Sequence, residues 1–189
     1  MVLPVRAMVV TVDEFLEMQL PEGKAELVRG EVRVTPPAGG PHGAAVSNLF
    51  LLLGSYVRDN KLGRVFADGF GYELTQLPHT VRVPDLSFVR TDALPRSGIG
   101  PGLLKLTPDL AVEVLSPSES ASALEEKLDD YAFAGTQLMW VVDPVRRTVT
   151  VVAADAPVRW LRDGDTLDGG ILLPGFSCTV SEIFEGIAR

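Results

Sequence analysis

The chain has 189 residues, of which 46% are hydrophobic and 22% are charged, and this composition excludes an intrinsically disordered protein. Its formal net charge of -8 at pH 7 argues against nucleic-acid binding through an overall basic surface, although it leaves room for local basic patches. The single cysteine, Cys178, cannot form an internal disulfide, the longest apolar run is too short to cross a bilayer, and residues 1–11 lack the features of a signal peptide. We therefore expect one domain over residues 1–189, located in the cytoplasm and without a membrane segment.

The N-terminal third is predicted to form a short helix, a hairpin and a longer helix. Thr11 and Glu14 have the spacing of a capping box, which would start the short helix. Residues 26–35 alternate apolar and polar side chains around Arg29-Gly30, the pattern of a small hairpin or of two strand pieces. Apolar residues spaced by three and four then predict a helix over residues 43–58 with one buried face.

Three strands are predicted in the middle of the chain. Residues 63–75 and 81–89 have the pattern of two strands, separated by a turn at Pro78-His79. Residues 110–115 are nearly all apolar and β-branched, which is typical of a strand that is buried on both faces. This third strand is expected to lie inside the central sheet.

The helix that follows has two possible starts, because Ser116 and Ser122 both offer N-caps. We favour Ser122, and Gly135 is expected to end the helix. Residues 138–143 and 147–152 are predicted strands. The remaining elements are a strand and turn at 160–165 and a short closing helix at 180–187. Strands and helices mixed in this order indicate an α/β or α+β domain around a central sheet.

Two carboxylates give the strongest functional signal. On a strand, Asp85 would share a face with Ser87 and Val89, whereas Glu113 interrupts an otherwise apolar strand. Burying an ionised carboxylate is costly unless it is paired or binds a metal. Two carboxylates on neighbouring strands would repel each other, and a divalent cation removes that cost. We therefore predict a metal site formed by Asp85 and Glu113, with oxygen ligands that favour Mg²⁺ or Mn²⁺ over zinc.

Lys127 is the third candidate residue. It lies on the buried stripe of its predicted helix, beside Leu124, Leu128 and Tyr131. A lysine in this position can run its apolar stem along the core and place its ammonium group near the end of the sheet. Two carboxylates that hold a metal and a lysine that orients water or stabilises negative charge are what metal-assisted phosphodiester hydrolysis requires.

At these residues the chain resembles the Uma-two family of restriction-endonuclease-like proteins. The matching segments are Glu26-Leu-Val-Arg-Gly-Glu31, His42, Pro84-Asp85, Pro108-Asp-Leu-Ala-Val-Glu-Val-Leu-Ser116, Lys127 with Tyr131, Trp140-Val-Val-Asp-Pro144 and Leu173-Pro-Gly-Phe176. The resemblance implies a restriction-endonuclease-like fold, with a central mixed β-sheet flanked by helices in a mixed α+β chain. It also implies a homodimeric endonuclease with DNA as its substrate and Mg²⁺ or Mn²⁺ as its cofactor.

The nuclease motif maps onto this chain with one departure. By resemblance, Asp85 takes the place of the first aspartate and Glu113 that of the second acid. Leu115 stands where the motif has its lysine, so Lys127 would be a migrated replacement from the helix. Glu26 resembles the additional acid that such nucleases place near the metal. The predicted catalytic residues are therefore Asp85, Glu113, Lys127 and Glu26.

Each carboxylate also has a purely structural interpretation. Asp85 follows Pro84 and could simply cap a turn. Asp109 shares a strand face with Glu113, and it is either a further ligand or the start of the strand. Glu113 could instead form a salt bridge with one of three basic residues, Arg82, Lys105 or Lys127.

The other candidates have structural alternatives as well. Lys127 has acidic neighbours on its helix and could form an ordinary surface ion pair. Glu26 could pair with Lys24 or Arg29 in a solvated hairpin. His42, at the start of the predicted helix 43–58, is interpreted as a loop residue rather than a catalytic one.

Two other functions remain open on the sequence alone. Leu115 at the position of the motif lysine, together with the acidic charge, is compatible with an inactive nucleic-acid-binding or regulatory protein on a nuclease scaffold. A metal-dependent hydrolase of a small phosphorylated substrate would not need a basic surface. The chain lacks the motifs of serine hydrolases, P-loop proteins and dinucleotide-binding proteins, and it has too few cysteines and histidines for a zinc cluster.

Overall fold

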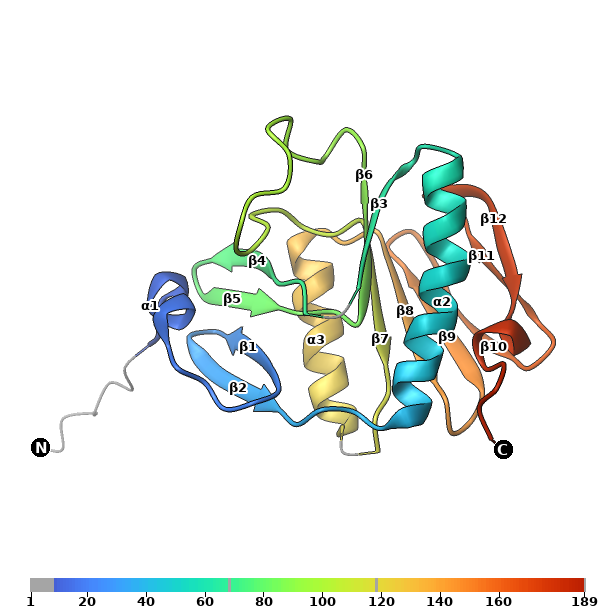
Figure 1. Cartoon of the computed structure of the whole chain (residues 1–189), viewed down its shortest axis with the longest axis horizontal. Helices are drawn as coiled ribbons and strands as arrows, with labels where there is room; N and C mark the ends of the chain where they lie inside the picture. The colour runs from blue at the N-terminus through green and yellow to red at the C-terminus, as the bar shows by residue number, and fades with distance from the viewer. Residues whose placement is uncertain (1–8, 68, 118, 189) are drawn as a thin grey trace, which may run out of the picture.

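The computed structural model describes residues 9–67, 69–117 and 119–188, and it shows a mixed α+β protein (Figure 1). Its largest sheet has six strands in the order β10-β9-β8-β7-β6-β3. Only β7 and β8 in this sheet run parallel; the other neighbouring strands are antiparallel. The strands are β3 (Gly63–Ala67), β6 (Leu86–Arg90), β7 (Leu110–Val114), β8 (Leu138–Asp143), β9 (Thr148–Ala153) and β10 (Ala156–Arg162).

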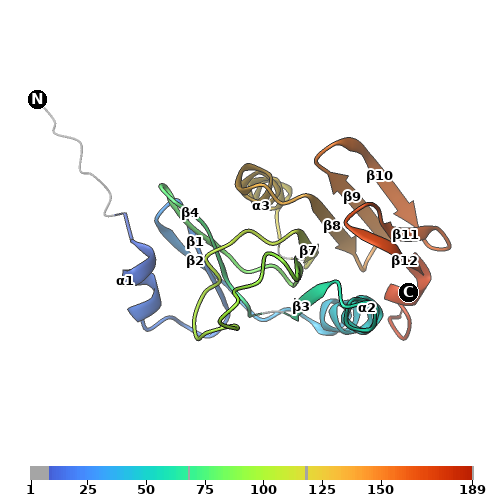
Figure 2. The same cartoon turned by 90° about the horizontal axis from the view of Figure 1, so that it is seen from above.

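Two long helices cover opposite faces of this sheet, as Figure 2 shows: α2 (Gly40–Asp59) and α3 (Ala121–Ala134). Successive residues of β7 point to opposite faces. Val112 and Val114 therefore pack in the same cluster as the buried side of α2, whereas Ala111 packs with Tyr131 of α3. A parallel strand pair requires a crossover, and α3 provides it between β7 and β8. Glu113 consequently lies on the face that α3 covers.

A second, four-stranded sheet lies beside α3, in the order β2-β1-β5-β4. Its strands are β1 (Lys24–Val28), β2 (Glu31–Thr35), β4 (Tyr72–Gln76) and β5 (His79–Arg82). The predicted hairpin is confirmed: Arg29 and Gly30 have φ angles of 51° and 83°, so both turn residues have the left-handed conformation that matches strand twist. The predicted capping box of Thr11 and Glu14 is also confirmed, and it starts α1 (Val12–Glu17), which packs against this sheet.

Two predicted strands are each divided between the two sheets. The expected strand 63–75 is in fact β3 and β4, and the expected strand 81–89 is β5 and β6. The chain thus leaves the six-stranded sheet after β3, forms the hairpin β4–β5 and returns at β6. Pro84 interrupts the second segment because it has no N–H to donate to a ladder. As a result Asp85 lies just before β6 and not within a strand.

Helix boundaries differ from prediction by a few residues. Helix α2 begins three residues earlier than expected, with Pro41 in its first turn, where a proline is tolerated. Helix α3 is capped by Ser120, whose Oγ accepts from the Ala123 N–H at 3.2 Å, and not by Ser122. Gly135 ends α3 in the left-handed conformation, with φ 96°, as predicted.

The C-terminal part completes the core on the α2 side. It contains a hairpin that the sequence analysis missed and a closing helix shorter than predicted: β11 (Thr166–Gly169), β12 (Leu173–Thr179) and α4 (Val180–Ile183). Phe176 stacks on Trp140 at a centroid distance of 5.9 Å, and Cys178 is a buried core residue. Within the described residues, no helix is long and apolar enough to cross a membrane.

Candidate active site

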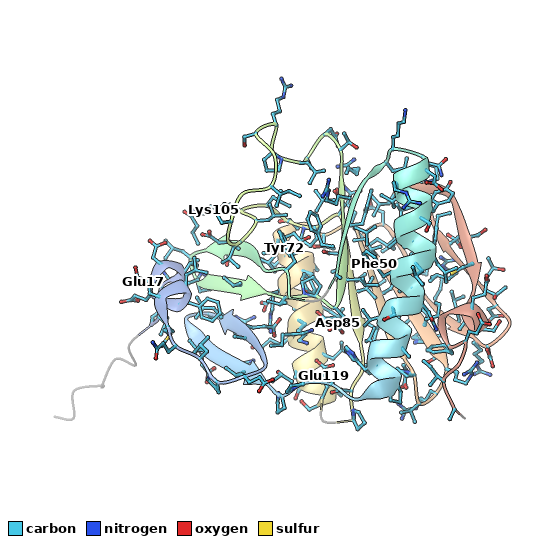
Figure 3. All side chains as sticks on the ribbon, viewed as in Figure 1. Glu17, Phe50, Tyr72, Asp85, Lys105 and Glu119 are labelled. Atoms are coloured by element: carbon cyan, nitrogen blue, oxygen red, sulfur yellow. The ribbon has the colours of Figure 1, made fainter. Side chains whose placement is uncertain are left out.

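Asp85 lies where the two sheets and α2 meet (Figure 3). It is a buried residue with only 1% of its surface exposed. Its Oδ1 forms an ion pair with Lys24 of β1. Its Oδ2 lies 3.1 Å from His42 Nε2 and accepts from the Val114 N–H at 2.7 Å. Burial alone would raise the pKa of Asp85, but the His42 hydrogen bond and the Lys24 charge lower it to about 2. Asp85 is therefore ionised at neutral pH.

Glu113, near the C-terminal end of β7, is also buried, with 2% exposure. Tyr131 donates its hydroxyl proton to Glu113 Oε1 at 2.8 Å, and Lys127 donates to Oε2 at 3.1 Å. Burial raises the pKa of Glu113 to about 7, although the positive charge of Lys127 opposes this rise. The negative charge of Asp85 raises the pKa of Glu113 further.

The two carboxylates belong to neighbouring segments of the chain. The pairing of β6 with β7 ends at Leu86 and Val112, and beyond it the Asp85 N–H donates to the Val112 carbonyl at 3.0 Å, which departs from the β6–β7 register. Asp85 Oδ2 accepts from the N–H of Val114, the residue that follows Glu113. These contacts bring the Asp85 carboxylate close enough to Glu113 for its negative charge to raise the Glu113 pKa.

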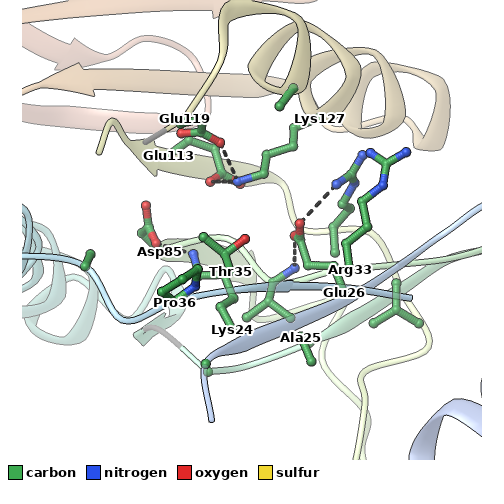
Figure 4. Close-up of a pocket in the computed structure, with 18 of the residues that line it drawn as sticks. Lys24, Ala25, Glu26, Arg33, Thr35, Pro36, Asp85, Glu113, Glu119 and Lys127 are labelled. Carbon is green, nitrogen blue, oxygen red and sulfur yellow. Dashed lines mark hydrogen bonds and ion pairs between the residues drawn. The ribbon is translucent and has the colours of Figure 1, made fainter. Parts of the chain in front are cut away.

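Lys127 joins this pair from α3 (Figure 4). Its ammonium group lies between the carboxylates of Glu113, at 3.1 Å, and Glu119, at 2.8 Å. Its side chain is 12% exposed, so the surface ion pair considered for it is wrong. Burial would lower the pKa of Lys127, but the negative charges of Glu113, Glu26 and Glu119 raise it above its ordinary value. The ammonium group thus remains protonated.

Glu26 lies in the same region but has a different partner from the ones considered. It is 4% exposed, accepts from Arg82 Nη1 at 3.0 Å and accepts from the Val83 N–H at 3.0 Å. The other side of the Arg82 guanidinium donates to Asp130 at 2.9 and 2.6 Å. We refer to Glu26, Arg82 and Asp130 as the Arg82 cluster. It joins the four-stranded sheet to α3.

Two further residues considered as partners or ligands lie elsewhere. Asp109, at the other end of β7, accepts from the N–H and Nε of Arg90 at 2.8 and 3.0 Å. Lys105 lies 3.6 Å from Glu73. The sequence left the role of Asp109 open because it shares a strand face with Glu113, and the structure gives it a local ion pair with Arg90.

A cleft of about 680 Å³ opens onto these residues. Asp85, Glu113, Lys127 and Glu26 all line it, so the structure brings the four residues predicted from the sequence to one cavity. Lys24, His42 and Glu119 line it as well, and the sequence analysis had assigned them no role in the site. The signal for His42 was its place in the family resemblance. Lys24 lies among other charged residues and Glu119 lies in a serine-rich segment before α3, and neither pattern gives a signal.

The carboxylates of the cleft fit the needs of a divalent metal in part. Magnesium is usually held by one or two carboxylates together with water and substrate phosphate. Asp85 and Glu113 supply two carboxylates that line one cleft, which fits that pattern. Among the residues that the structure describes, no group of three or more His, Cys, Asp or Glu side chains is placed to hold a metal. Any metal here would therefore rest on this pair, and Lys24 would have to leave Asp85 Oδ1.

The chain matches the model of a known protein family. The model of the Uma2 family, described as "putative restriction endonuclease", matches residues 12–181. The chain belongs to the Uma2 family. The resemblance that the sequence motifs indicated is thereby confirmed.

The fold of this Uma2 protein is shared with a solved structure. A crystal structure from Anabaena variabilis, described as a "putative nuclease belonging to DUF820", aligns with a TM-score of 0.81 and 22% identity, over 93% of this chain and 97% of that chain. This likeness confirms the predicted fold class, a restriction-endonuclease-like arrangement of a mixed sheet flanked by helices. No match was found among proteins with curated descriptions.

Proposed function

We propose that this Uma2 protein is a divalent-metal-dependent DNA endonuclease whose catalytic residues are Asp85, Glu113 and Lys127, with Glu26 as a positioning residue. The observation that carries the proposal is that two buried carboxylates, Asp85 just before β6 and Glu113 in β7, line one cleft together with Lys127, which pairs with Glu113. Family membership supports a nuclease of this fold. Buried carboxylates are costly unless they are paired or bind a metal, and Lys24 and Lys127 supply the pairing cations in this structure.

The proposed mechanism assigns a separate role to each side chain. A magnesium or manganese ion held by Asp85 and Glu113 would polarise the scissile phosphate and acidify a water molecule. Lys127 keeps its proton because acidic neighbours raise its pKa. Its Nζ therefore offers positive charge to the phosphate and does not act as a general base. Glu119 and Glu113 hold that ammonium group at the cleft wall.

Tyr131 and Glu26 support the proposed site from behind. The Tyr131 hydroxyl donates to Glu113 Oε1 and fixes the orientation of this carboxylate, which leaves Oε2 with Lys127. Glu26 has both of its oxygens engaged, by Arg82 and by the Val83 N–H. We assign Glu26 a positioning role, because it holds the segment that leads directly into Asp85.

The experiment is a cleavage assay on supercoiled, linear and single-stranded DNA with Mg²⁺ or Mn²⁺. We expect Asp85→Asn and Glu113→Gln to lower cutting at least about 100-fold, because each removes a charge from the proposed metal site. Mn²⁺ binding measured by calorimetry should weaken in both variants while circular dichroism stays unchanged. Asp109→Asn is the matched control, since it changes a buried carboxylate of the same strand region outside the cleft. Absence of cutting by the folded wild-type protein with either metal would refute the proposal.

A second candidate function is a non-catalytic nucleic-acid-binding protein. The ion pair between Lys24 and Asp85 favours it, because the chain supplies its own cation where the first metal ligand is expected. Leu115 at the position of the motif lysine points the same way. This candidate would be supported by DNA binding that is unchanged by metal and accompanied by no cutting.

A further inference from the structure

The cleft has two chemically different ends. The charged end is the candidate active site described above. The other end is apolar and is formed mainly by α1 and the segment that follows it, where the lining residues are Phe15, Leu16, Met18 and Leu20, together with Leu103, which packs against the same cluster as Phe15. Leu16 and Met18 are 54% and 46% exposed at this end. A continuous cavity therefore joins an apolar surface to the carboxylate and lysine groups.

The apolar end of the cleft packs against the four-stranded sheet. Phe15 is 7% exposed and packs in one cluster with Val81 and Leu27 of the four-stranded sheet. Leu103 lies so close to Gly71 that a Cβ on this glycine would be 2.5 Å from the Leu103 side chain. Phe15 and Leu103 are thus closely packed, and the exposed Leu16 and Met18 lie next to this packed region. Exposed apolar groups beside a polar site are typical of ligand contact.

The two ends match the two parts of a nucleotide. Its phosphate is anionic and suits Lys24 and Lys127, whereas the faces of its base are flat and largely apolar. In a duplex the base is stacked and cannot enter a side cavity without leaving the helix. The net charge of -8 also disfavours holding an intact duplex by a broad basic surface, so affinity has to come from local contacts.

We propose that the apolar end of the cleft binds the unpaired base of a single-stranded or extrahelical nucleotide in DNA, next to the phosphate that is cut. This inference rests on the proposed function and names its substrate class. A volume of about 680 Å³ is within the range of sites that enclose small organic ligands, so both parts of a nucleotide fit in it. The substrates would be DNA ends, loops and bulges rather than fully paired DNA.

The test compares two DNA probes that differ in one nucleotide: a fully paired duplex, and the same duplex with one extrahelical fluorescent purine. Binding is measured by anisotropy without Mg²⁺ or Mn²⁺, so that cutting does not interfere. We expect the wild type to bind the extrahelical probe about tenfold more tightly than the paired one. The variant Leu16→Gln/Met18→Gln should lose this preference and keep its affinity for the paired duplex.

The matched control is Ile171→Gln, which makes a similar neutral change at a fully exposed apolar residue that does not line the cleft. It should keep the wild-type preference. Equal affinity of the wild type for both probes, or an equal loss on both in the cleft variant, would overturn the inference. A preference for the extrahelical probe that survives in the cleft variant would also overturn the inference. If light scattering of that variant then shows a change of oligomeric state, a second copy of the chain occupies the apolar end. If the preference is present and no form cuts DNA with metal, the proposed nuclease activity fails and the base site stands.

Discussion

The protein buries two groups of charges within one small region, and they are built differently. In the Arg82 cluster one guanidinium donates to carboxylates on both of its sides and is 2% exposed. At the cleft, Asp85 and Glu113 are just as buried, but their cations are lysines whose side chains reach the cavity with 18% and 12% exposure. A planar guanidinium holds its partners in a fixed geometry, whereas an ammonium group on a flexible stem can move.

This difference separates structural charges from exchangeable ones. The Arg82 cluster has its partners inside the protein and connects the four-stranded sheet to α3, so its contribution is to stability. Under the proposed function, a metal would replace the lysines beside the carboxylates, and the lysines would turn toward a phosphate. The same pairing chemistry therefore supports two roles, and the exposure of the cation decides which one it serves.

The largest expected effect comes from removing the fixed cation. Arg82→Met leaves the buried Glu26 without its guanidinium partner and Asp130 with Arg29 alone, and we expect the free energy of unfolding to fall by about 3–5 kcal/mol in urea titrations. Arg33→Gln is the control within the neighbouring ion pairs. Arg33 is 40% exposed where it pairs with Glu126, so its loss should cost less than about 1 kcal/mol. Similar losses of stability in Arg82→Met and Arg33→Gln would show that burial of the arginine does not decide how much its ion pairs contribute to stability.

The next effect is a pH dependence of stability in the metal-free protein. The folded-state pKa of Glu113 is raised to about 7, so its contribution to stability is complete below its unfolded value near 4.5 and is lost as the pH rises through 7. The pKa of Asp85 is lowered to about 2, and its contribution is lost only as the pH falls toward 2. Stability should therefore decline by up to about 3 kcal/mol between about pH 5 and 7.

Substitution of Glu113 tests this assignment. In Glu113→Gln the decline between about pH 5 and 7 should disappear from urea midpoints measured across this range, because the titrating group is gone. Glu125→Gln, an exposed change on α3, should keep the wild-type profile. A decline that persists in Glu113→Gln would assign the titration to another group.

The smallest expected effect concerns the hydroxyl that orients Glu113. Tyr131→Phe removes the donor to Glu113 Oε1 and keeps the ring, so we expect a loss of about 1–2 kcal/mol in stability. Calorimetry should also show about tenfold weaker Mn²⁺ binding, because Tyr131 positions a proposed ligand. Tyr56→Phe is the control, since its hydroxyl donates to the Pro174 carbonyl away from the cleft. Unchanged Mn²⁺ affinity in Tyr131→Phe would limit its role to packing.

Local patterns in the amino-acid sequence were enough to locate several elements. They placed the buried strand that carries Glu113, the helix that carries Lys127 and Tyr131, and the hairpin around Arg29-Gly30. These elements follow from periodicity and turn chemistry over short stretches of chain. The family resemblance added the fold class, because its motifs span nearly the whole chain, and it selected four residues that do line one cleft.

The partners of those residues, in contrast, depend on the folded arrangement of the chain. Lys24 and Asp85 are 61 residues apart, and His42 and Asp85 are 43 apart. Glu26 pairs with Arg82, 56 residues away. Local propensity carries no information about such contacts, since they form only when the strand order has brought β1, β5, β6 and α2 together. Asp85 also lies outside a strand because the chain changes sheets at Pro84, which a strand pattern does not reveal.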